Sequence, residues 1–180
     1  MNASPDAAAR AAGIRLVALD VDGTLTDGRL FIGPGGEAMK AFSVRDGFGL
    51  TLLREAGIVL AVITARRSAI VEVRAAELKL DEVLQGVHDK AEALRALCLR
   101  RQVAPAAAAF VGDDWPDLGA MALAGLAATV ADAPAAVRER AHWVSQARAG
   151  RGAVREFAEF VLLAQGRLDD ALARYAGPTA

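Results

Sequence analysis

Residues 15–24 read Arg-Leu-Val-Ala-Leu-Asp-Val-Asp-Gly-Thr, an apolar run that ends in two carboxylates, a glycine and a threonine. Such a run predicts a strand buried on both faces of a sheet. Asp20 and Asp22 follow at its C-terminal end, where open α/β sheets place their ligand crevice. Because Gly23 permits a sharp turn, both carboxylates can face one pocket. A plain polar turn explains this motif equally well, so the stretch alone leaves function open.

The same strand pattern recurs along the chain, and helical patterns separate the repeats. Apolar runs at 58–63 and 107–111 predict two more buried strands. Apolar residues at helical spacing predict helices at 47–56, 69–80 and 90–102. Strands that alternate with helices indicate a parallel sheet covered on both faces. The predicted fold class is therefore α/β, as a Rossmann-like three-layer sandwich.

One insertion interrupts this alternation. Strand-like residues at 28–32 and 37–42 flank Gly33-Pro34-Gly35-Gly36, which has the composition of a tight reversal. The sequence therefore predicts a β-hairpin directly after the first acidic loop.

The chain is expected to form one domain, because 180 residues suffice for one core and no linker rich in Gly, Ser or Pro divides them. We expect a flexible segment at 1–13, the domain at 14–165 and a loosely held tail at 166–180. The last elements predicted within the domain are a short helix near Pro134, a strand at 143–144 and a helix at 153–165.

Composition narrows the classes of function. The formal net charge is -1 and the basic residues form no dense run, which argues against nucleic-acid binding. Apolar residues make up 54% of the chain, but no run approaches the ~18 residues of a membrane span. Asp6 and Arg10 interrupt the N-terminal segment, so no export signal is expected and the cytoplasm is the expected location. The single cysteine, Cys98, excludes an intrachain disulfide.

A second acidic cluster, Gly112-Asp113-Asp114-Trp115-Pro116-Asp117, follows the strand predicted at 107–111. Because parallel strands end at one edge of a sheet, its carboxylates should lie near the first pair. Crowded carboxylates repel one another unless a hard divalent cation with oxygen ligands holds them, and Mg²⁺ is the natural candidate. Alternatively, Asp114 and Asp117 cap the next helix and only Asp113 acts.

Two further polar residues occupy positions suited to a phosphate. Thr64 ends the strand predicted at 58–63, where its hydroxyl and the next backbone N–H groups can hold phosphate oxygens. Lys90 begins a predicted helix, which is unfavourable for a cation and suggests a use. The alternatives are a helix-capping threonine and a solvated surface lysine.

Taken in order, these motifs resemble the four motifs of phosphatases of the haloacid dehalogenase superfamily. The matching residues are Asp20, Asp22, Gly23 and Thr24, then Thr64, then Lys90, then Gly112, Asp113 and Asp114. The resemblance implies that Asp20 is the nucleophile that attacks phosphorus, while Asp22 protonates the leaving alcohol and later deprotonates water. Thr64 and Lys90 would then hold the transferring phosphoryl group.

The same resemblance implies a bound Mg²⁺ ion. Asp20, the backbone carbonyl of Asp22 and Asp113 would be its ligands, with Asp117 a weaker candidate nearby. The cation would reduce the repulsion between the nucleophile and the anionic phosphate.

The spacing of the motifs leaves no room for a cap domain. Only the hairpin and one helix fit between Asp22 and Thr64, and only a helix and a strand fit between Thr64 and Lys90. The chain thus resembles the capless branch, in which a β-hairpin builds a homotetramer and a neighbouring subunit covers each active site. Within that branch it is similar, from Ile14 to Leu168, to the phosphatases of 3-deoxy-D-manno-octulosonate 8-phosphate, an intermediate of lipopolysaccharide synthesis.

This likeness implies a small sugar-acid phosphate as substrate. Arg66 and Arg74, eight residues apart on a predicted helix, are the cations expected to bind the carboxylate, unless both are solvated surface arginines. Asp22 and Lys90 are also expected to contact the substrate. A loop that is either substrate-facing or a plain helix start comprises Ser43, Val44, Arg45, Asp46 and Gly47. Residues 150–156 are similar to a tail motif that reaches toward a neighbouring active site.

Other functions remain as alternatives. Phosphatases of nine-carbon sialic-type sugar acids tend to carry Glu where this chain has Arg66 and Lys where it has Glu77, so the eight-carbon substrate is favoured. A phosphomutase would need a cap to shield its intermediate from water. A non-catalytic binding module on the same fold would usually have lost one of the motif residues.

Overall fold

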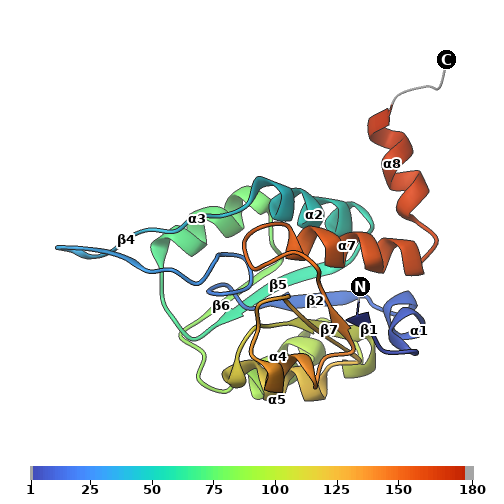
Figure 1. Cartoon of the computed structure of the whole chain (residues 1–180), viewed down its shortest axis with the longest axis horizontal. Helices are drawn as coiled ribbons and strands as arrows, with labels where there is room; N and C mark the ends of the chain where they lie inside the picture. The colour runs from blue at the N-terminus through green and yellow to red at the C-terminus, as the bar shows by residue number, and fades with distance from the viewer. Residues whose placement is uncertain (1, 177–180) are drawn as a thin grey trace.

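A seven-stranded sheet forms the centre of the computed structural model, which describes residues 2–176 (Figure 1). The strand order is β1-β9-β8-β7-β2-β5-β6; six strands run parallel, and β1 pairs antiparallel with β9 at one edge. The strands are β1 (Asn2–Ala3), β2 (Leu16–Leu19), β5 (Val59–Thr64), β6 (Glu82–Gln85), β7 (Ala108–Val111), β8 (Leu126–Thr129) and β9 (Trp143–Val144).

Helices cover both faces of this sheet. In Figure 1, α2, α3 and α7 lie above it, and α4 and α5 lie below it. The helices are α1 (Ala7–Ala12), α2 (Val44–Glu55), α3 (Ala69–Leu78), α4 (Lys90–Arg100), α5 (Leu118–Leu123), α6 (Ala135–Arg138), α7 (Ala153–Ala164) and α8 (Leu168–Ala176), with short 3₁₀ turns η1 (Pro105–Ala107) and η2 (Trp115–Asp117). The predicted three-layer α/β architecture is confirmed.

The central strand β2 shows why two cores form. Val17 and Leu19 pack into the core under α2 and α7, whereas Leu16 and Ala18 pack into the core over α4 and α5. Successive side chains of a strand point to opposite faces, so an uninterrupted apolar run supplies both cores at once. All four residues are completely buried.

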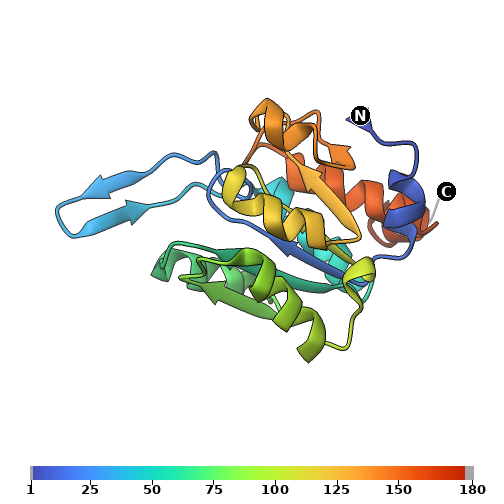
Figure 2. The ribbon, with the colours of Figure 1, turned by 90° about the horizontal axis from the view of Figure 1, so that it is seen from below.

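The predicted hairpin is present, with shorter strands than the sequence suggested. Strands β3 (Phe31–Gly33) and β4 (Gly36–Met39) pair antiparallel around a two-residue turn, Pro34-Gly35. Figures 1 and 2 show this hairpin projecting from the body of the molecule. No cap domain lies between the elements of residues 2–176, and no helix among them is long and apolar enough to cross a membrane.

The two terminal segments differ from expectation, because within the described residues both contain regular structure. Helix α1 buries Ala7 and Ala11 completely, one turn apart, and packs against α7. In α8, the Tyr175 hydroxyl donates to the Glu55 carboxylate at 3.1 Å, and the Tyr175 ring meets Phe48 edge-on at 5.0 Å. Alanine-rich and charged segments give weak sequence signals, since tertiary contacts decide their structure. The boundaries of the domain remain a prediction, and residue 1 and residues 177–180 of the expected segments lie outside the described residues.

A buried carboxylate connects α2 to α7. Helix α7 begins after Gly152, which has no side chain to cap the first N–H groups. Asp46 of α2 takes that role, because its carboxylate accepts hydrogen bonds from the backbone N–H of Gly152 at 3.1 Å and of Arg155 at 2.9 Å. Asp46 is 1% exposed, and its negative charge also lies at the favourable end of the helix dipole.

We predict that Asp46→Ala lowers the free energy of unfolding by about 1–3 kcal/mol, since it leaves the N–H groups of Gly152 and Arg155 without an acceptor. The measurement is urea denaturation followed by circular dichroism. Asp89→Ala is the matched control: the Asp89 carboxylate caps α4 through the N–H of Glu92 at 2.9 Å, but at an exposed position. Its loss should be smaller, about 0.5–1 kcal/mol, and a loss as large as that at Asp46 would contradict this account.

Candidate active site

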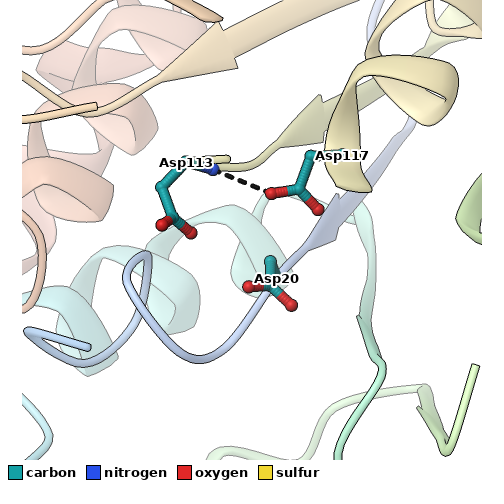
Figure 3. Close-up of side chains that lie close together, drawn as sticks. All are labelled: Asp20, Asp113 and Asp117. Carbon is teal, nitrogen blue, oxygen red and sulfur yellow. Dashed lines mark hydrogen bonds between the residues drawn. The ribbon is translucent and has the colours of Figure 1, made fainter. Parts of the chain in front are cut away.

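Three carboxylates meet at the C-terminal edge of the sheet (Figure 3). Asp20 follows β2, and Asp113 and Asp117 come from the segment after the neighbouring strand β7. Because β2 and β7 pair in parallel, with the Asp20 N–H donating to the Val111 carbonyl at 2.9 Å, their ends lie side by side. Each carboxylate offers one oxygen, and these oxygens all lie within 4.8 Å of one another.

Glycines allow the two acidic loops to approach. Gly23 adopts φ +95°, and a Cβ there would lie 2.1 Å from Oδ2 of Asp113. A Cβ at Gly112 would lie 2.5 Å from the Cβ of Asp117. The Thr24 hydroxyl then donates to Oδ1 of Asp113 at 3.0 Å. Gly23 and Thr24 of the first loop and Gly112 of the second therefore bring the carboxylates together.

Lys90 is the cation of this cluster. From the first position of α4, its ammonium donates to Oδ1 of Asp20 at 2.7 Å and to Oδ1 of Asp117 at 2.5 Å. Burial lowers the pKa of Lys90, but these two carboxylates outweigh it, so the pKa is raised. Lys90 is 5% exposed, so the surface-lysine alternative is wrong.

The two remaining acidic residues of the second motif have different roles. Oδ2 of Asp117 accepts from the backbone N–H groups of Asp113 at 2.9 Å and Asp114 at 3.1 Å, which fixes the loop. Asp114 is exposed, and its carboxylate caps η2 through the N–H of Trp115 at 2.8 Å. Asp114 is thus a capping residue, as one alternative held, while Asp117 belongs to the buried cluster.

The charges of the cluster are incompletely balanced. Burial, together with repulsion from Asp117, raises the pKa of Asp20 to about 6 against the pull of Lys90. Burial and the charges of Asp20 and Asp117 raise the pKa of Asp113 to about 7. A hard divalent cation that prefers oxygen ligands would relieve this repulsion, so the donor set fits Mg²⁺.

Asp22 contacts cations at the base of the hairpin and after β5. Its Oδ1 accepts from the ammonium of Lys40, and Nε of Arg66 lies 3.8 Å from its Oδ2. Lys40 also pairs with Oε1 of Glu37 at 2.9 Å, and the Ser68 hydroxyl donates to the other Glu37 oxygen. Lys40 is not predictable as a site residue from the sequence, because nothing in its local pattern distinguishes it from an ordinary charged residue of a hairpin.

Thr64 lies where the sequence predicted it. It ends β5, the strand beside β2, and is 3% exposed. Its hydroxyl therefore belongs to the same sheet edge as Asp20, and its role toward phosphate stays a prediction.

The two arginines predicted to bind the substrate carboxylate have different surroundings in the structure. Arg66 lies beside Asp22 with its side chain 46% exposed. Arg74 is only 17% exposed, because its guanidinium contacts Glu77 at 2.8 Å and the Ser43 carbonyl at 3.5 Å and lies 5.7 Å above the ring of Phe42. Arg66 is therefore the better placed of the two to meet a ligand.

The loop at 43–47 is largely the start of α2. Ser43 caps that helix by accepting a hydrogen bond from the N–H of Asp46 at 3.3 Å. A side chain at Gly47 would clash with Arg74, because a Cβ there would lie 2.3 Å from Nη2. Both oxygens of Asp46 are occupied by α7, which argues against a direct substrate contact. Val44 and Arg45 are exposed, and their roles stay predictions.

The segment 150–156 lies against the catalytic loop of its own subunit. The Gly150 N–H donates to the Thr24 carbonyl at 3.2 Å, and a Cβ at Gly150 would lie 2.7 Å from the backbone nitrogen of Asp27. Residues from Ala153 onward form α7, whose buried side chains belong to the core. In the structure, the segment therefore supports its own site instead of extending away from the domain.

Known proteins share this fold and much of this sequence. Residues 63–157 match the model of the haloacid dehalogenase-like hydrolases. The chain is 44% identical over 168 residues to an enzyme of Escherichia coli K12, which covers 93% of this chain and 89% of that one. The chain belongs to the haloacid dehalogenase-like hydrolases, as the sequence motifs suggested.

These relatives are named for the same enzymatic activity. The Escherichia coli enzyme is a 3-deoxy-D-manno-octulosonate 8-phosphate phosphatase, as is a Yersinia pestis protein of known structure with 43% identity, a TM-score of 0.89 and coverage of 92% of this chain and 89% of that chain. The Moraxella catarrhalis phosphatase of the same name was solved with magnesium, phosphate and KDO; it has 39% identity, a TM-score of 0.92 and coverage of 94% and 98%.

We predict that Mg²⁺ binding depends steeply on pH. The raised pKa values, about 6 for Asp20 and about 7 for Asp113 against an ordinary 3.8, mean that protons stabilise the metal-free fold below pH 4 and that this stability is lost as the pH rises through 6 to 7. Mg²⁺ must displace these protons, so its apparent affinity should fall about tenfold per pH unit between pH 7 and 6 and more steeply below pH 6, where Asp20 is also protonated. Calorimetric titration between pH 5.5 and 8 measures this.

Two variants control this prediction. Asp113→Asn should abolish most of the affinity for Mg²⁺, whereas Asp114→Asn, at the exposed capping residue, should leave it unchanged. An affinity that does not vary with pH would contradict the assignment of the raised pKa values to the metal-binding carboxylates.

Proposed function

We propose that this protein is a Mg²⁺-dependent phosphatase that hydrolyses 3-deoxy-D-manno-octulosonate 8-phosphate to the free sugar acid and inorganic phosphate. The observation that carries the proposal is the buried Asp20 carboxylate, held by Lys90 at 2.7 Å beside Asp113 and Asp117. The relatives that share the fold and 39–44% of the sequence carry this activity in their names.

The first chemical step transfers the phosphoryl group to Asp20. The Lys90 ammonium binds Oδ1, which leaves Oδ2 of Asp20 for the attack on phosphorus. As the new oxygen–phosphorus bond forms, the bond from phosphorus to the sugar oxygen breaks, and the electron pair stays on that oxygen. Asp22 gives this oxygen a proton, so the alcohol leaves uncharged. The product on the protein is an aspartyl phosphate.

The second step releases phosphate. Water attacks phosphorus, Asp22 takes a proton from that water, and the bond between phosphorus and the Asp20 oxygen breaks. Lys90 and the hydroxyl of Thr64 offset charge on the phosphoryl oxygens throughout, and bound Mg²⁺, with Asp20, Asp113 and the Asp22 carbonyl as ligands, would neutralise the phosphate further. Dividing the hydrolysis into two steps lowers each barrier.

Recognition of the sugar acid requires a cation apart from the phosphate. Arg66 is placed for this, because its guanidinium lies beside Asp22 at the edge of the site and remains partly open to solvent. A nine-carbon sugar acid 9-phosphate is the alternative substrate, but the phosphatases of such compounds tend to carry Glu where this chain has Arg66. Arg66 therefore favours the eight-carbon compound.

We further propose that the active enzyme is a homotetramer located in the cytoplasm. The hairpin supports the assembly, because four apolar side chains on it are exposed by 40% to 65%, and soluble monomers seldom present such a group together. These residues are Leu30, Phe31, Ile32 and Met39. A neighbouring subunit seated on the hairpin would cover the site, which no cap domain covers.

We predict that the protein with Mg²⁺ releases phosphate from 3-deoxy-D-manno-octulosonate 8-phosphate with a higher kcat/KM than from nine-carbon sugar-acid phosphates or simple sugar phosphates. Asp20→Asn should reduce kcat by about 10⁴-fold or more, because it removes the nucleophile at nearly constant volume. A colorimetric assay of released phosphate measures both quantities.

The controls for Asp20→Asn are its elution volume in gel filtration, which should match that of the wild type, and its melting temperature, which should not fall because a repelled buried charge is removed. Full activity in this variant would contradict the mechanism, and a preference for the nine-carbon substrates would contradict the choice of substrate.

We predict that Ile32→Asp breaks the tetramer into smaller species and lowers kcat/KM, because the charge lies on the proposed contact surface. Leu99→Asp, at an apolar residue of α4 that is 81% exposed, is the matched control and should remain tetrameric. Light scattering coupled to gel filtration measures the mass. A wild-type protein that is monomeric and fully active would defeat the assembly proposal.

A further inference from the structure

Lys40 lies at an unusual position, where the hairpin returns to the body of the molecule. Its side chain is only 1% exposed, and its ammonium contacts two carboxylates, Oδ1 of Asp22 and Oε1 of Glu37. These partners come from different elements, since Asp22 follows β2 and Glu37 lies on β4. Lys40 therefore connects the hairpin directly to the acid–base residue.

The network continues into the helix layer. The Ser68 hydroxyl, at the start of α3, donates to the second oxygen of Glu37 and also accepts from the N–H of Val71 at 3.4 Å. Glu37 is thereby held by groups on two sides, and it holds Lys40 in turn. A buried ammonium is stable only with such partners, so these contacts fix the position of the Lys40 ammonium.

The two oxygens of Asp22 have different environments. Oδ1 is bound by Lys40, while Oδ2 is buried and has no hydrogen-bond partner within residues 2–176. The charged neighbour on the side of Oδ2 is Arg66, whose Nε lies 3.8 Å away. An unpartnered buried carboxylate oxygen is unfavourable unless a ligand or water completes it. Oδ2 is therefore the atom available for proton exchange with a substrate.

We propose that Lys40 is a positioning residue for the reaction: by binding Oδ1 of Asp22, it orients Oδ2 toward the oxygen of the leaving alcohol. This inference rests on the proposed phosphatase activity and adds to it a residue outside the four motifs. Lys40 does not contact the reacting atoms in this account, so its effect passes entirely through Asp22. Efficient proton transfer requires the donor within hydrogen-bond reach of its target, which a freely rotating carboxylate does not maintain.

If the role of Lys40 were only structural, its substitution would have a different effect. If Lys40 only neutralised buried charge at the base of the hairpin, its loss would weaken every reaction of the enzyme alike. If it positions the proton donor, its loss matters most when the leaving group needs a proton. An alkyl alcohol needs one, whereas 4-nitrophenolate departs without protonation.

The experiment compares Lys40→Met with the wild type on two substrates, with Mg²⁺ present. For 3-deoxy-D-manno-octulosonate 8-phosphate, kcat should fall about 100-fold while KM changes by less than about threefold, since the lost interaction acts in the transition state. For 4-nitrophenyl phosphate, the first-turnover release of 4-nitrophenolate, measured by stopped flow, should fall less than about threefold. First-turnover release isolates the transfer to Asp20 from the later hydrolysis.

Further variants keep the test decisive even where Lys40→Met folds poorly. Lys40→Arg retains a cation and should recover at least about one tenth of the wild-type kcat. Glu37→Gln weakens the hold on Lys40 without touching Asp22 and should give a smaller loss with the same substrate selectivity. Lys79→Met, the same substitution at an exposed lysine, should match the wild type in both assays.

The inference is overturned by a kcat within about twofold of wild type for Lys40→Met, or by equal losses on the two substrates. A rise in KM at unchanged kcat would also overturn it. A wild-type enzyme without activity on the sugar-acid phosphate would instead defeat the proposed function, so the two failures are distinguishable.

Discussion

The site depends on the confinement of like charges at one edge of the sheet. Asp20, Asp113 and Asp117 come within 4.8 Å of one another, and Lys90 is the one ammonium among the described residues that bridges two of them. Burial, together with repulsion among these carboxylates, raises the pKa of Asp20 and Asp113. The fold tolerates the repulsion because parallel strands and glycine turns fix the backbone. The remaining negative charge and the carboxylate oxygen donors together suit a hard divalent cation such as Mg²⁺.

The parts of this arrangement that the sequence predicts are those that depend on chain-local patterns. The apolar run before Asp20 and the run before Gly112 define neighbouring buried strands, and the order of strands and helices requires a parallel sheet. Once both acidic loops follow strands of one sheet, their meeting at one edge is a geometric consequence. Lys90 was detectable for a related reason, since a cation at the start of a helix needs compensation.

Other features depend on contacts between distant segments, and the local pattern does not report them. Asp46 lies in what the sequence presents as a possible substrate loop, but it caps α7 more than a hundred residues away. Arg66 and Arg74 do not share a helix as expected, because α3 begins at Ala69 and only Arg74 lies on it. The Arg74 guanidinium contacts Ser43, Phe42 and Glu77. Strand β8 and helix α1 are not predicted from the sequence for a similar reason. Their alanine-rich sequences are compatible with a strand or a helix, and only packing decides between the two.

The hairpin joins two requirements of a phosphatase that lacks a cap domain. Its strands expose apolar side chains suited to a neighbouring subunit, and its base holds Lys40 against Asp22. Met39 directly precedes Lys40, so an exposed apolar side chain and the contact with Asp22 lie on the same short segment. Since Glu37 and Ser68 clamp the base to α3, a hairpin held by a neighbour would steady the acid–base carboxylate as well as cover it. Coverage of the site and orientation of its proton donor would then share one structural cause.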